Sequence, residues 1–340
     1  MERRAATIQD VAARAGVSIT TVSRVLNDTG YPMRPETRRR VIEAIEALDF
    51  RPSPLARGLL GKSTSTIGLI IPDISNPYYP LLSRGVEDVA SEHGYTVIFC
   101  NTDRNLAKLR SYLEVLREKQ ADGIIFAGGG IETDGEHLTP DEIGDRVVLI
   151  GRHRWPLPSV QIDNTRAAYE ATSHLIALGH RRIAYLGGPT ALTSARDRMK
   201  GYRQAMLELV GAGPWETLIR EGDFGFESGY QAILSLLSQA VGQRPTAIFA
   251  ANDQMALGVL AAARDLGTAV PEELAVVGFD DIPAGRYVRP SLTTVALPTY
   301  EMGASAARLL LQLLAGDTTE QTILLPTQLV VRQSSGEPLR

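Results

Sequence analysis

The N-terminal part of the chain carries hydrophobic positions at the spacing of two short helices that are separated by a tight turn. The first helix has Thr7 before it as a suitable N-cap, and its inward face consists of Ile8, Val11 and Ala12. Gly16 interrupts this pattern, because it can take the positive φ that a tight turn needs. Ser18 offers a second N-cap, and the helix from 19 to 26 directs inward Val22, Val25 and Leu26. Two short helices joined by such a turn predict a helix-turn-helix motif.

A third helix is predicted over 36–48, with one apolar face made of Val41, Ile42, Ile45 and Leu48. Pro35 suits the first turn of this helix, although Arg34 before it is a weak cap. Three helices around one core predict a small all-α domain over residues 1–50. The following segment, 51–65, is rich in proline and glycine and is therefore a poor autonomous helix. It is either a simple linker or a hinge between domains.

From residue 66 onward the pattern changes to short apolar strands that alternate with amphipathic helices. Strands are expected at 66–72, 96–100, 123–128, 146–151, 182–188, 217–222, 246–252 and 275–281. Helices fit between them at about 78–93, 105–119, 164–178, 197–210, 227–239 and 253–266. Repeated strand–helix alternation predicts parallel sheets with helices on both faces. Two such series predict an α/β body of two doubly wound lobes, with a ligand cleft at the carboxyl ends of the strands.

The length and the charge distribution support this division into domains. A chain of 340 residues is too long for a single hydrophobic core. Residues 1–62 hold eleven Lys and Arg against seven Asp and Glu, whereas the rest of the chain holds 24 against 32. A basic N-terminal part on an acidic body is typical of a protein that contacts nucleic acid at one end only.

Several functional classes find no support in the sequence. No apolar run approaches the roughly 18 residues of a membrane span, and the charged N-terminus has no apolar signal-peptide core, so we expect a cytoplasmic protein without a membrane partner. The single cysteine, Cys100, ends an apolar run and is expected to be buried. The five histidines show no metal-ligand spacing, and GxGxxG, GxSxG and HExxH motifs are absent. We therefore predict no metal, no cofactor and no enzymatic activity.

The second helix of the motif carries side chains that suit base edges and phosphates better than a core: Thr20, Thr21, Ser23, Arg24 and, beyond it, Asn27. On periodicity alone, an ordinary helical hairpin with a polar outer face remains an alternative. The stretch AGVSITTVSRVLN, so close to the N-terminus, resembles the DNA-binding headpiece of the lac and gal repressor (LacI/GalR) family of bacterial transcriptional regulators. The resemblance runs through nearly the whole chain, and the body also resembles periplasmic sugar-binding proteins.

The resemblance implies a set of DNA contacts. Bases would be read by Ile19, Thr20 and Arg24, with Arg24 as the candidate for guanine. Four residues would position the recognition helix on phosphates: Ser18, Thr21, Ser23 and Asn27. Thr7 is a further predicted DNA contact. Segment 51–65 would become a hinge helix on operator DNA. In that hinge Leu59 would be an apolar wedge in the minor groove, and Arg57 would contact a phosphate.

The resemblance also places a small effector in the cleft between the lobes. Arg198 would bridge hydroxyls or grip a carboxylate with its forked donors, with Arg196 as a competing assignment. Phe224 would pack an aromatic ring on the ligand, with Phe226 as its competitor. The other predicted ligand contacts are Asn76, Tyr78, Asn252 and Asp280.

Two further assignments at the cleft are more open. Asp253 is expected to cap the helix that follows it, which would leave the ligand contact to Asn252. Arg152 and Trp155 either form part of the cleft wall or belong to a surface loop.

The resemblance sets the lobe boundaries and the expected function. The first lobe would comprise about 66–162 and 292–321, and the second about 163–291 and 322–340. The expected function is that of a repressor that binds a pseudopalindromic operator in double-stranded DNA as a homodimer and responds to a sugar-like effector. A purine or a protein co-regulator is the alternative controlling partner. A solute-binding protein or a doubly wound enzyme is disfavoured, because export and phosphate-loop signals are missing.

Overall fold

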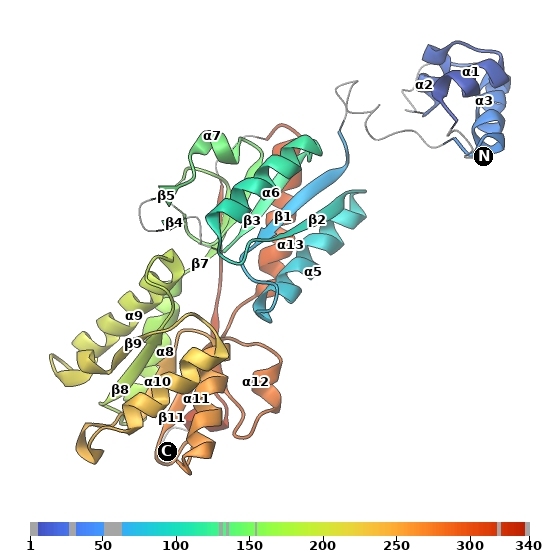
Figure 1. Ribbon diagram of the computed structural model, residues 1–340. Coiled ribbons are helices and arrows are strands. Elements are labelled where there is room, and N and C mark those ends of the chain that lie inside the picture. Colours follow the sequence, from blue (N-terminus) through green and yellow to red (C-terminus); the bar gives the residue numbers. More distant parts are fainter. Residues whose placement is uncertain are drawn as a thin grey trace. The chain divides into compact units, whose positions relative to one another are not determined.

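The computed structural model describes residues 6–26, 32–50, 63–128, 132–133, 136–153, 155–317 and 321–336. Contacts between Cα atoms divide the chain into two compact units, Met1–Thr64 and Ser65–Arg340. These units are the headpiece and the body (Figure 1). Three residues of the predicted DNA-binding set lie outside the described residues: Asn27, Arg57 and Leu59.

The described part of the headpiece forms the helices α1 (Ile8–Ala15), α2 (Ile19–Leu26) and α3 (Pro35–Ala47). Thr7 caps α1 as predicted: its hydroxyl accepts a hydrogen bond from the Asp10 backbone, and its own backbone N–H donates to the Asp10 carboxylate at 2.8 Å. Gly16 ends α1 with a φ of 64°, which a residue with a side chain adopts only with strain. Ser18 Oγ then accepts the Thr21 backbone N–H at 3.2 Å and begins α2. The helix-turn-helix is thus defined by its own capping residues.

The headpiece core is small and takes one fully buried valine from each helix: Val11, Val22 and Val41. The prediction that Ile42 faces inward is wrong, because its side chain is 42% exposed. Ala44 is buried in its place, since positions three, four and seven residues after Val41 share the inner face of a helix. Arg34 provides no side-chain cap for α3.

The first lobe of the body is built on a sheet whose six strands are all parallel. Their order is β13-β7-β6-β3-β1-β2. The strands are β1 (Thr66–Ile71), β2 (Thr96–Asn101), β3 (Gly123–Ala127), β6 (Val147–Ile150), β7 (Ser159–Ile162) and β13 (Thr322–Leu325). The associated helices are α5 (Tyr78–Glu92), α6 (Leu106–Glu118), α7 (Pro140–Ile143) and α13 (Thr299–Leu314). A short hairpin, β4 (Glu132–Thr133) and β5 (Glu136–His137), follows β3.

The second lobe repeats this plan with the strand order β14-β12-β11-β10-β8-β9, in which β14 is antiparallel to β12. Its strands are β8 (Ile183–Gly187), β9 (Ile219–Glu221), β10 (Ala247–Ala250), β11 (Ala275–Asp280), β12 (Thr293–Ala296) and β14 (Gln328–Val330). Its helices are α8 (Asn164–Ala177), α9 (Thr193–Leu209), α10 (Phe226–Leu237), α11 (Asp253–Asp265) and α12 (Ala284–Tyr287). Short 3₁₀ turns cover Pro214–Leu218, Val241–Gln243 and Gln333–Ser335.

The chain changes lobe at places that differ in part from the prediction. The first change, after β7, falls at residue 163 as expected. The assignment of 292–298 to the first lobe is wrong, because β12 pairs with β11 of the second sheet. The assignment of 322–335 to the second lobe is wrong for β13, which pairs with β7, and only β14 returns to the second sheet. The changes therefore fall at Leu297-Pro298 and Pro326-Thr327, where proline cannot continue a ladder of hydrogen bonds.

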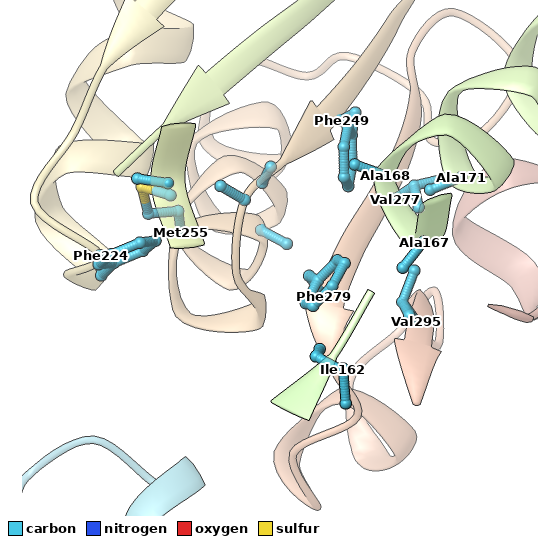
Figure 2. Close-up of a cluster of buried hydrophobic side chains, with 14 of the residues drawn as sticks. Ile162, Ala167, Ala168, Ala171, Phe224, Phe249, Met255, Val277, Phe279 and Val295 are labelled. Atoms are coloured by element: carbon cyan, nitrogen blue, oxygen red, sulfur yellow. The ribbon is translucent and has the colours of Figure 1, made fainter. Parts of the chain in front are cut away.

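Both sheets are covered by helices, and their central strands are accordingly apolar throughout. All six residues of β11 and all four of β10 are buried. Figure 2 shows Phe249 and Phe279 of these strands, with side chains of α8 packed beside Val277 and Val295. The same cluster includes Phe224 and Met255, so this core continues to the carboxyl ends of the strands, where a ligand site is expected.

Glycine permits close packing of the helices that flank the first sheet. α5 and α13 lie side by side (Figure 1). A Cβ on Gly303 of α13 would come within 2.0 Å of the Leu82 carbonyl oxygen, and one on Gly85 of α5 within 2.1 Å of the Tyr300 carbonyl oxygen. Only glycine allows this approach of two backbones, which brings the start of α5 and the start of α13 together beneath the cleft. No helix in the described part of the chain has the length and apolar character of a membrane span.

Candidate DNA-binding and effector sites

The outer face of α2 presents the side chains that the sequence predicts as base-reading residues. Ile19 is 45% exposed although it is large and apolar, and Thr20 and Arg24 are exposed as well. Val22 is fully buried on the opposite face, so the core determines which side of α2 points outward. Thr21 and Ser23 are half-buried at the edges of this face. A single exposed apolar side chain is common on protein surfaces, so the exposure of Ile19 places it on the outer face of α2 and carries no further weight.

Two of the predicted DNA-contacting residues have structural hydrogen bonds of their own. The Thr7 hydroxyl donates to the Asp10 carboxylate at 2.7 Å, and Ser18 Oγ lies 2.9 Å from Thr21 Oγ1. These bonds hold the ends of α1 and α2 in place. In the described headpiece, Thr7 and Ser18 therefore position the recognition helix whether or not they also contact DNA.

The body contains a cavity between the carboxyl ends of the two sets of strands. Its volume is about 100 Å³, which exceeds the roughly 10–15 Å³ that one water molecule requires. Side chains of both lobes line it, and among them are the predicted residues Asn76, Tyr78, Arg198, Phe224, Asn252 and Asp280. These residues are far apart in the sequence. Asn76, Phe224, Asn252 and Asp280 lie at or shortly after strand ends, Tyr78 begins α5, and Arg198 belongs to α9.

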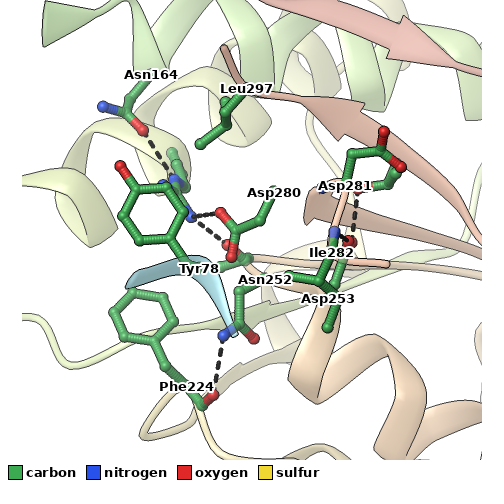
Figure 3. Close-up of polar contacts among 12 residues, drawn as sticks. Tyr78, Asn164, Phe224, Asn252, Asp253, Asp280, Asp281, Ile282 and Leu297 are labelled. Atoms are coloured by element: carbon green, nitrogen blue, oxygen red, sulfur yellow. Dashed lines mark hydrogen bonds and ion pairs between the residues drawn. The ribbon is translucent and has the colours of Figure 1, made fainter. Parts of the chain in front are cut away.

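Arg198 occupies the centre of this site and is held from several sides. Its Nε donates to Asn164 Oδ1 at 2.8 Å, and its Nη1 donates to the Ala251 carbonyl oxygen at 2.5 Å (Figure 3). The guanidinium carbon lies 3.8 Å from the centre of the Phe279 ring. Asn164, the first residue of α8, thus lines the cavity and orients Arg198, while Asp163 caps α8. Arg196 bonds to the loop 190–193 instead and is not the cavity residue.

Asp280 faces Arg198 across a distance of 3.8 Å between Oδ1 and Nη1. Burial raises the pKa of the Asp280 carboxyl to about 8, and the nearby guanidinium offsets only part of this effect. The backbone of Asp280 has a φ of 121°, and that of the next residue, Asp281, has a φ of 57°. Non-glycine residues adopt such values at a cost in free energy, which the surrounding structure must compensate. Asp281 points away from the cavity and pairs with Arg286 and Arg332.

The prediction that Asp253 caps α11 is wrong. Asn252, not Asp253, caps α11: its side-chain oxygen accepts the Met255 backbone N–H at 3.0 Å. Its amide nitrogen donates to the Phe224 carbonyl oxygen at 2.8 Å, so Asn252 also fixes the loop that carries the aromatic ring (Figure 3). Asp253 is completely buried and accepts hydrogen bonds from Thr294 Oγ1 and the Ile282 backbone. It joins β12 to the turn after β11, and burial raises its pKa to about 6.

Two aromatic side chains from opposite lobes reach the cavity. Phe224 is 9% exposed with a φ of 68°, and its ring lies on Gly188, where a Cβ would come within 2.0 Å of the ring. Phe226 is 44% exposed and does not line the cavity, so Phe224 is the residue that reaches it. Tyr78 donates its hydroxyl to Met302 Sδ at 3.6 Å, and Asn76 Oδ1 accepts the Tyr78 backbone N–H. Burial raises the pKa of the Tyr78 hydroxyl far above its usual value.

Two arginines connect the lobes, and one of them differs from the prediction. Arg152 is not part of the cavity wall, because its guanidinium pairs with Asp197 of α9 through contacts of 2.8 and 2.5 Å. Trp155 lies in the first-lobe core, where it stacks on His153. Arg104, which follows β2, lines the cavity and donates to the Asp223 carbonyl oxygen at 2.7 Å. The sequence signal for Arg104 is its place in a loop after a strand end, which many polar residues share.

Other predicted features near the site have structural roles. Cys100 is buried at the end of β2, and burial raises the pKa of its thiol to about 11. His180 Nδ1 lies 3.0 Å from Thr246 Oγ1 and forms a structural hydrogen bond with it. Gly128 lines the cavity, whereas the two glycines after it lie outside the described residues. No group of three or more potential metal ligands occurs in the part of the chain that the structure describes.

Comparisons with known proteins agree with this division into headpiece and body. Residues 7–53 match the bacterial regulatory proteins of the lacI family, and residues 172–335 match the periplasmic binding protein-like domain. Catabolite control protein A of Priestia megaterium is 41% identical over 334 residues, which cover 97% of this chain and 99% of that protein. The lac repressor dimer bound to operator and the anti-inducer ONPF has a TM-score of 0.83 at 28% identity, covering 98% and 99% of the two chains. The complex of the transcriptional regulator CelR with cellobiose has a TM-score of 0.70 at 34% identity, covering 97% and 99%.

A helix-turn-helix headpiece followed by a two-lobed, ligand-binding body defines a class of DNA-binding transcriptional regulators. The chain belongs to the lacI family of bacterial regulatory proteins. Its relatives are transcriptional regulators and not enzymes, in agreement with the prediction from the sequence.

Proposed function

We propose that this protein is a transcriptional repressor that binds a pseudopalindromic operator as a homodimer and is controlled by a small sugar-like effector. The observation that carries the proposal is the cavity of the body, where Arg198, Asp280 and Asn252 converge at strand ends beside two aromatic rings. A guanidinium, a carboxyl and amides suit a ligand with many hydroxyl groups, and ring faces suit the apolar face of a sugar. The CelR structure, in which a regulator of this family holds cellobiose, supports this class of ligand.

On the DNA side, α2 would enter the major groove of each half-site. Ile19, Thr20 and Arg24 are exposed on α2 and are suitably placed on its outer face to reach base edges. The proposal includes a hinge at 51–65. In this hinge Leu59 would be a wedge in the minor groove and Arg57 would contact a phosphate. Both residues lie outside the described residues.

Communication between the two sites would result from closure of the lobes. The effector would contact both lobes at once, and the contacts of Arg104 with Asp223 and of Arg152 with Asp197 would stabilise the closed form. A change in the relation of the lobes would alter the hinges and with them the affinity for the operator. Such coupling is reciprocal between the two ligands and typically amounts to about 1–3 kcal/mol.

The dimer is supported by exposed apolar side chains on the first lobe. Ile74 is 58% exposed, Leu81 50% and Phe99 46%. The Ile74 backbone N–H donates to Asn101 at the end of β2, so the loop that carries Ile74 adjoins the edge strand that carries Phe99. An apolar surface along a sheet edge is typical of a protein interface, and the lac repressor relative is itself a dimer on its operator.

Control by a purine is the second candidate, and the two aromatic residues favour it. Tyr78 and Phe224 come from opposite lobes and both line the cavity, as two rings would around a planar base. Binding of sugars and binding of purines therefore have to be compared directly.

The proposal is tested by fluorescence anisotropy of the full-length protein on DNA from upstream of its own and neighbouring genes. Titrations at fixed salt would be run with and without sugars, sugar phosphates and purine bases, because phosphate contacts make the affinity salt-dependent. Site-specific binding that one sugar-like compound alters is the expected result. An effect of purines alone would favour the second candidate, and an absence of specific binding at low salt would contradict the proposal.

A further inference from the structure

The cavity is lined by more cationic than anionic side chains. Among the described residues that line it, the charged ones are Arg104, Arg198 and Asp280. The cavity thus has two guanidinium groups and one carboxyl. The carboxyl, that of Asp280, lies near Arg198, so Arg104 has no acidic partner among the described residues of the cavity lining. A role for Arg104 in ligand binding rests on the proposed function, because it concerns the effector of the same cavity.

The loop after β2 holds Arg104 in a fixed and strained position. Asp103 and Arg104 have φ values of 52° and 57°, and two successive non-glycine residues in the left-handed region are costly. The Arg104 backbone N–H donates to the Pro72 carbonyl oxygen at 3.2 Å, which fixes the loop to the end of β1. From there the side chain crosses to the second lobe. Its guanidinium carbon lies 5.8 Å from the centre of the Phe224 ring.

The acidic residues beside Arg104 are engaged mainly by other groups. Asp103 is engaged by Lys108 Nζ at 2.6 Å and by the Asn101 amide at 2.7 Å. Arg104 donates to the Asp223 backbone carbonyl, while the Asp223 carboxylate accepts the Gly225 backbone N–H at 2.7 Å. Hydrogen bonds, that of Ser228 foremost, lower the pKa of the Asp223 carboxyl, and the charge of Arg104 makes the last-ranked contribution. Within the described residues no carboxylate forms an ion pair with Arg104. A guanidinium with five N–H donors thus faces a ligand cavity with most of them available.

We propose that the effector is a polyhydroxylated small molecule that carries an anionic group, a carboxylate or a phosphate, and that Arg104 binds this group. Arginine matches both anions with paired, charge-assisted hydrogen bonds. In this proposal Arg198, Asp280 and Asn252 bind the hydroxyl groups, and Arg104 determines the specificity for the anionic group. The anion also strengthens closure, because Arg104 already contacts the second lobe.

The test compares neutral sugars with their acidic counterparts by isothermal titration calorimetry on the full-length protein. The probes are ribose with ribose 5-phosphate, and glucose with glucose 6-phosphate and with glucuronate. At least one acidic member is expected to bind about tenfold or more tightly than its neutral parent, a difference of about 1.4 kcal/mol. The phosphate and glucuronate arms distinguish the two anionic groups. Inorganic phosphate alone is expected to bind much more weakly, because it lacks the hydroxyl groups.

Variants assign the preference to Arg104. Arg104→Gln is expected to reduce the affinity for the acidic member at least tenfold more than that for the neutral parent, which loses only the contact between the lobes. Arg104→Lys is expected to retain part of the preference, since it keeps the charge without the fork. Arg84→Gln, which removes an exposed cation of α5 outside the cavity, serves as the matched control and is expected to retain the wild-type preference.

The proposal is overturned if no acidic compound binds more tightly than its neutral parent, or if inorganic phosphate binds as tightly as a sugar phosphate. It is also overturned if Arg104→Gln weakens neutral and acidic members equally, because the residue would then have only a structural role. Operator binding is measured in parallel by anisotropy. A protein that binds operator but shows no anion preference contradicts this inference alone, whereas a protein without specific DNA binding contradicts the proposed function.

Discussion

Single residues around the cavity are held in conformations that an unconstrained chain avoids. Phe224, Asp280 and Asp281 have φ values of 68°, 121° and 57°, and all three lie at strand ends that border the cavity or adjoin it. Backbone conformations of this kind cost of order 1–3 kcal/mol each and persist where the surroundings enforce them. The Asn252 amide and the ion pairs of Asp281 provide that enforcement. These contacts therefore fix the backbone of the second-lobe wall of the cavity.

Arg198→Ala is expected to remove the response to the effector and to leave operator binding within about threefold of wild type. The guanidinium is the only described group that joins Asn164, Ala251 and Asp280 across the site. Anisotropy on operator DNA, with and without the compound that acts on the wild type, measures both quantities. Arg196→Ala is the matched control on the same helix. A full response of the Arg198 variant would remove this residue from the effector site.

Asp280 predicts a pH dependence of stability. Its pKa is about 8 in the folded protein, well above that of an unfolded aspartate, so the folded state binds more protons between roughly pH 4 and pH 8. Its contribution to the free energy of unfolding is therefore greatest at low pH and is lost as the pH rises through about 8. The groups that face it are Arg198, Asp253, Tyr78 and Tyr79.

Urea denaturation of wild type and Asp280→Asn at pH 5 and pH 8 checks this expectation. The amide cannot ionise, so the stability of the variant relative to wild type is expected to increase from pH 5 to pH 8. Asp253 is present in both proteins, and its own titration affects them similarly. An equal difference at the two pH values would show that the Asp280 carboxyl ionises normally.

At the scale of elements, α2 is defined by the contrast between its faces. Val22 is buried while Ile19, Thr20 and Arg24 are exposed. Arg24→Ala is expected to cost about 1–3 kcal/mol of operator affinity and to relax specificity at one base position, as loss of a base-reading arginine does. Binding to a set of single-base operator variants measures both effects. A uniform loss over all the variants would instead assign Arg24 to a phosphate.

The contact between α5 and α13 depends on two glycines at their crossing. Gly303→Ala is expected to destabilise the body by about 1–3 kcal/mol, because the new methyl group would overlap the Leu82 carbonyl, which cannot move independently of its helix. Gly242→Ala is the matched control, since a Cβ there would meet nothing within 4 Å. Thermal and urea denaturation compare the two variants. Equal stability would show that the helices can separate without loss.

At the scale of the whole molecule, function would require two copies of the chain. Phe99→Glu, on the edge strand β2, is expected to weaken the dimer at least tenfold and operator binding with it, because a charge would be buried in the interface. Leu324→Glu is the matched control on β13, the opposite edge of the same sheet. Analytical ultracentrifugation measures dimerisation. A variant Phe99→Glu that dimerises like the wild type would place the interface elsewhere.

Local signals in the sequence were sufficient for the helices, most strands and the approximate place of the ligand site. Thr7 and Gly16 define the helix-turn-helix through bonds and angles within a few residues. The apolar periods of the body predict alternating strands and helices, and parallel strands bring their carboxyl ends to one edge. Residues such as Arg198, Phe224 and Asp280 are distant in sequence. The resemblance to the lacI family helps to assign them to one cavity, and all three line it in the structure.

Contacts between distant segments decided the rest. β12 pairs with β11 and β13 pairs with β7. The sequence of a short apolar strand does not indicate which strand it pairs with, so the sheet to which it belongs could not be predicted locally. Asn252 and Asp253 are adjacent, and only the positions of Met255 and Thr294 decide which one caps the helix. Arg152 and Arg104 both follow strands. Arg152 forms an ion pair with Asp197, whereas Arg104 lines the cavity. Sequence periodicity determined the elements of this protein, whereas the partners that each strand end meets across the lobes determined its binding site.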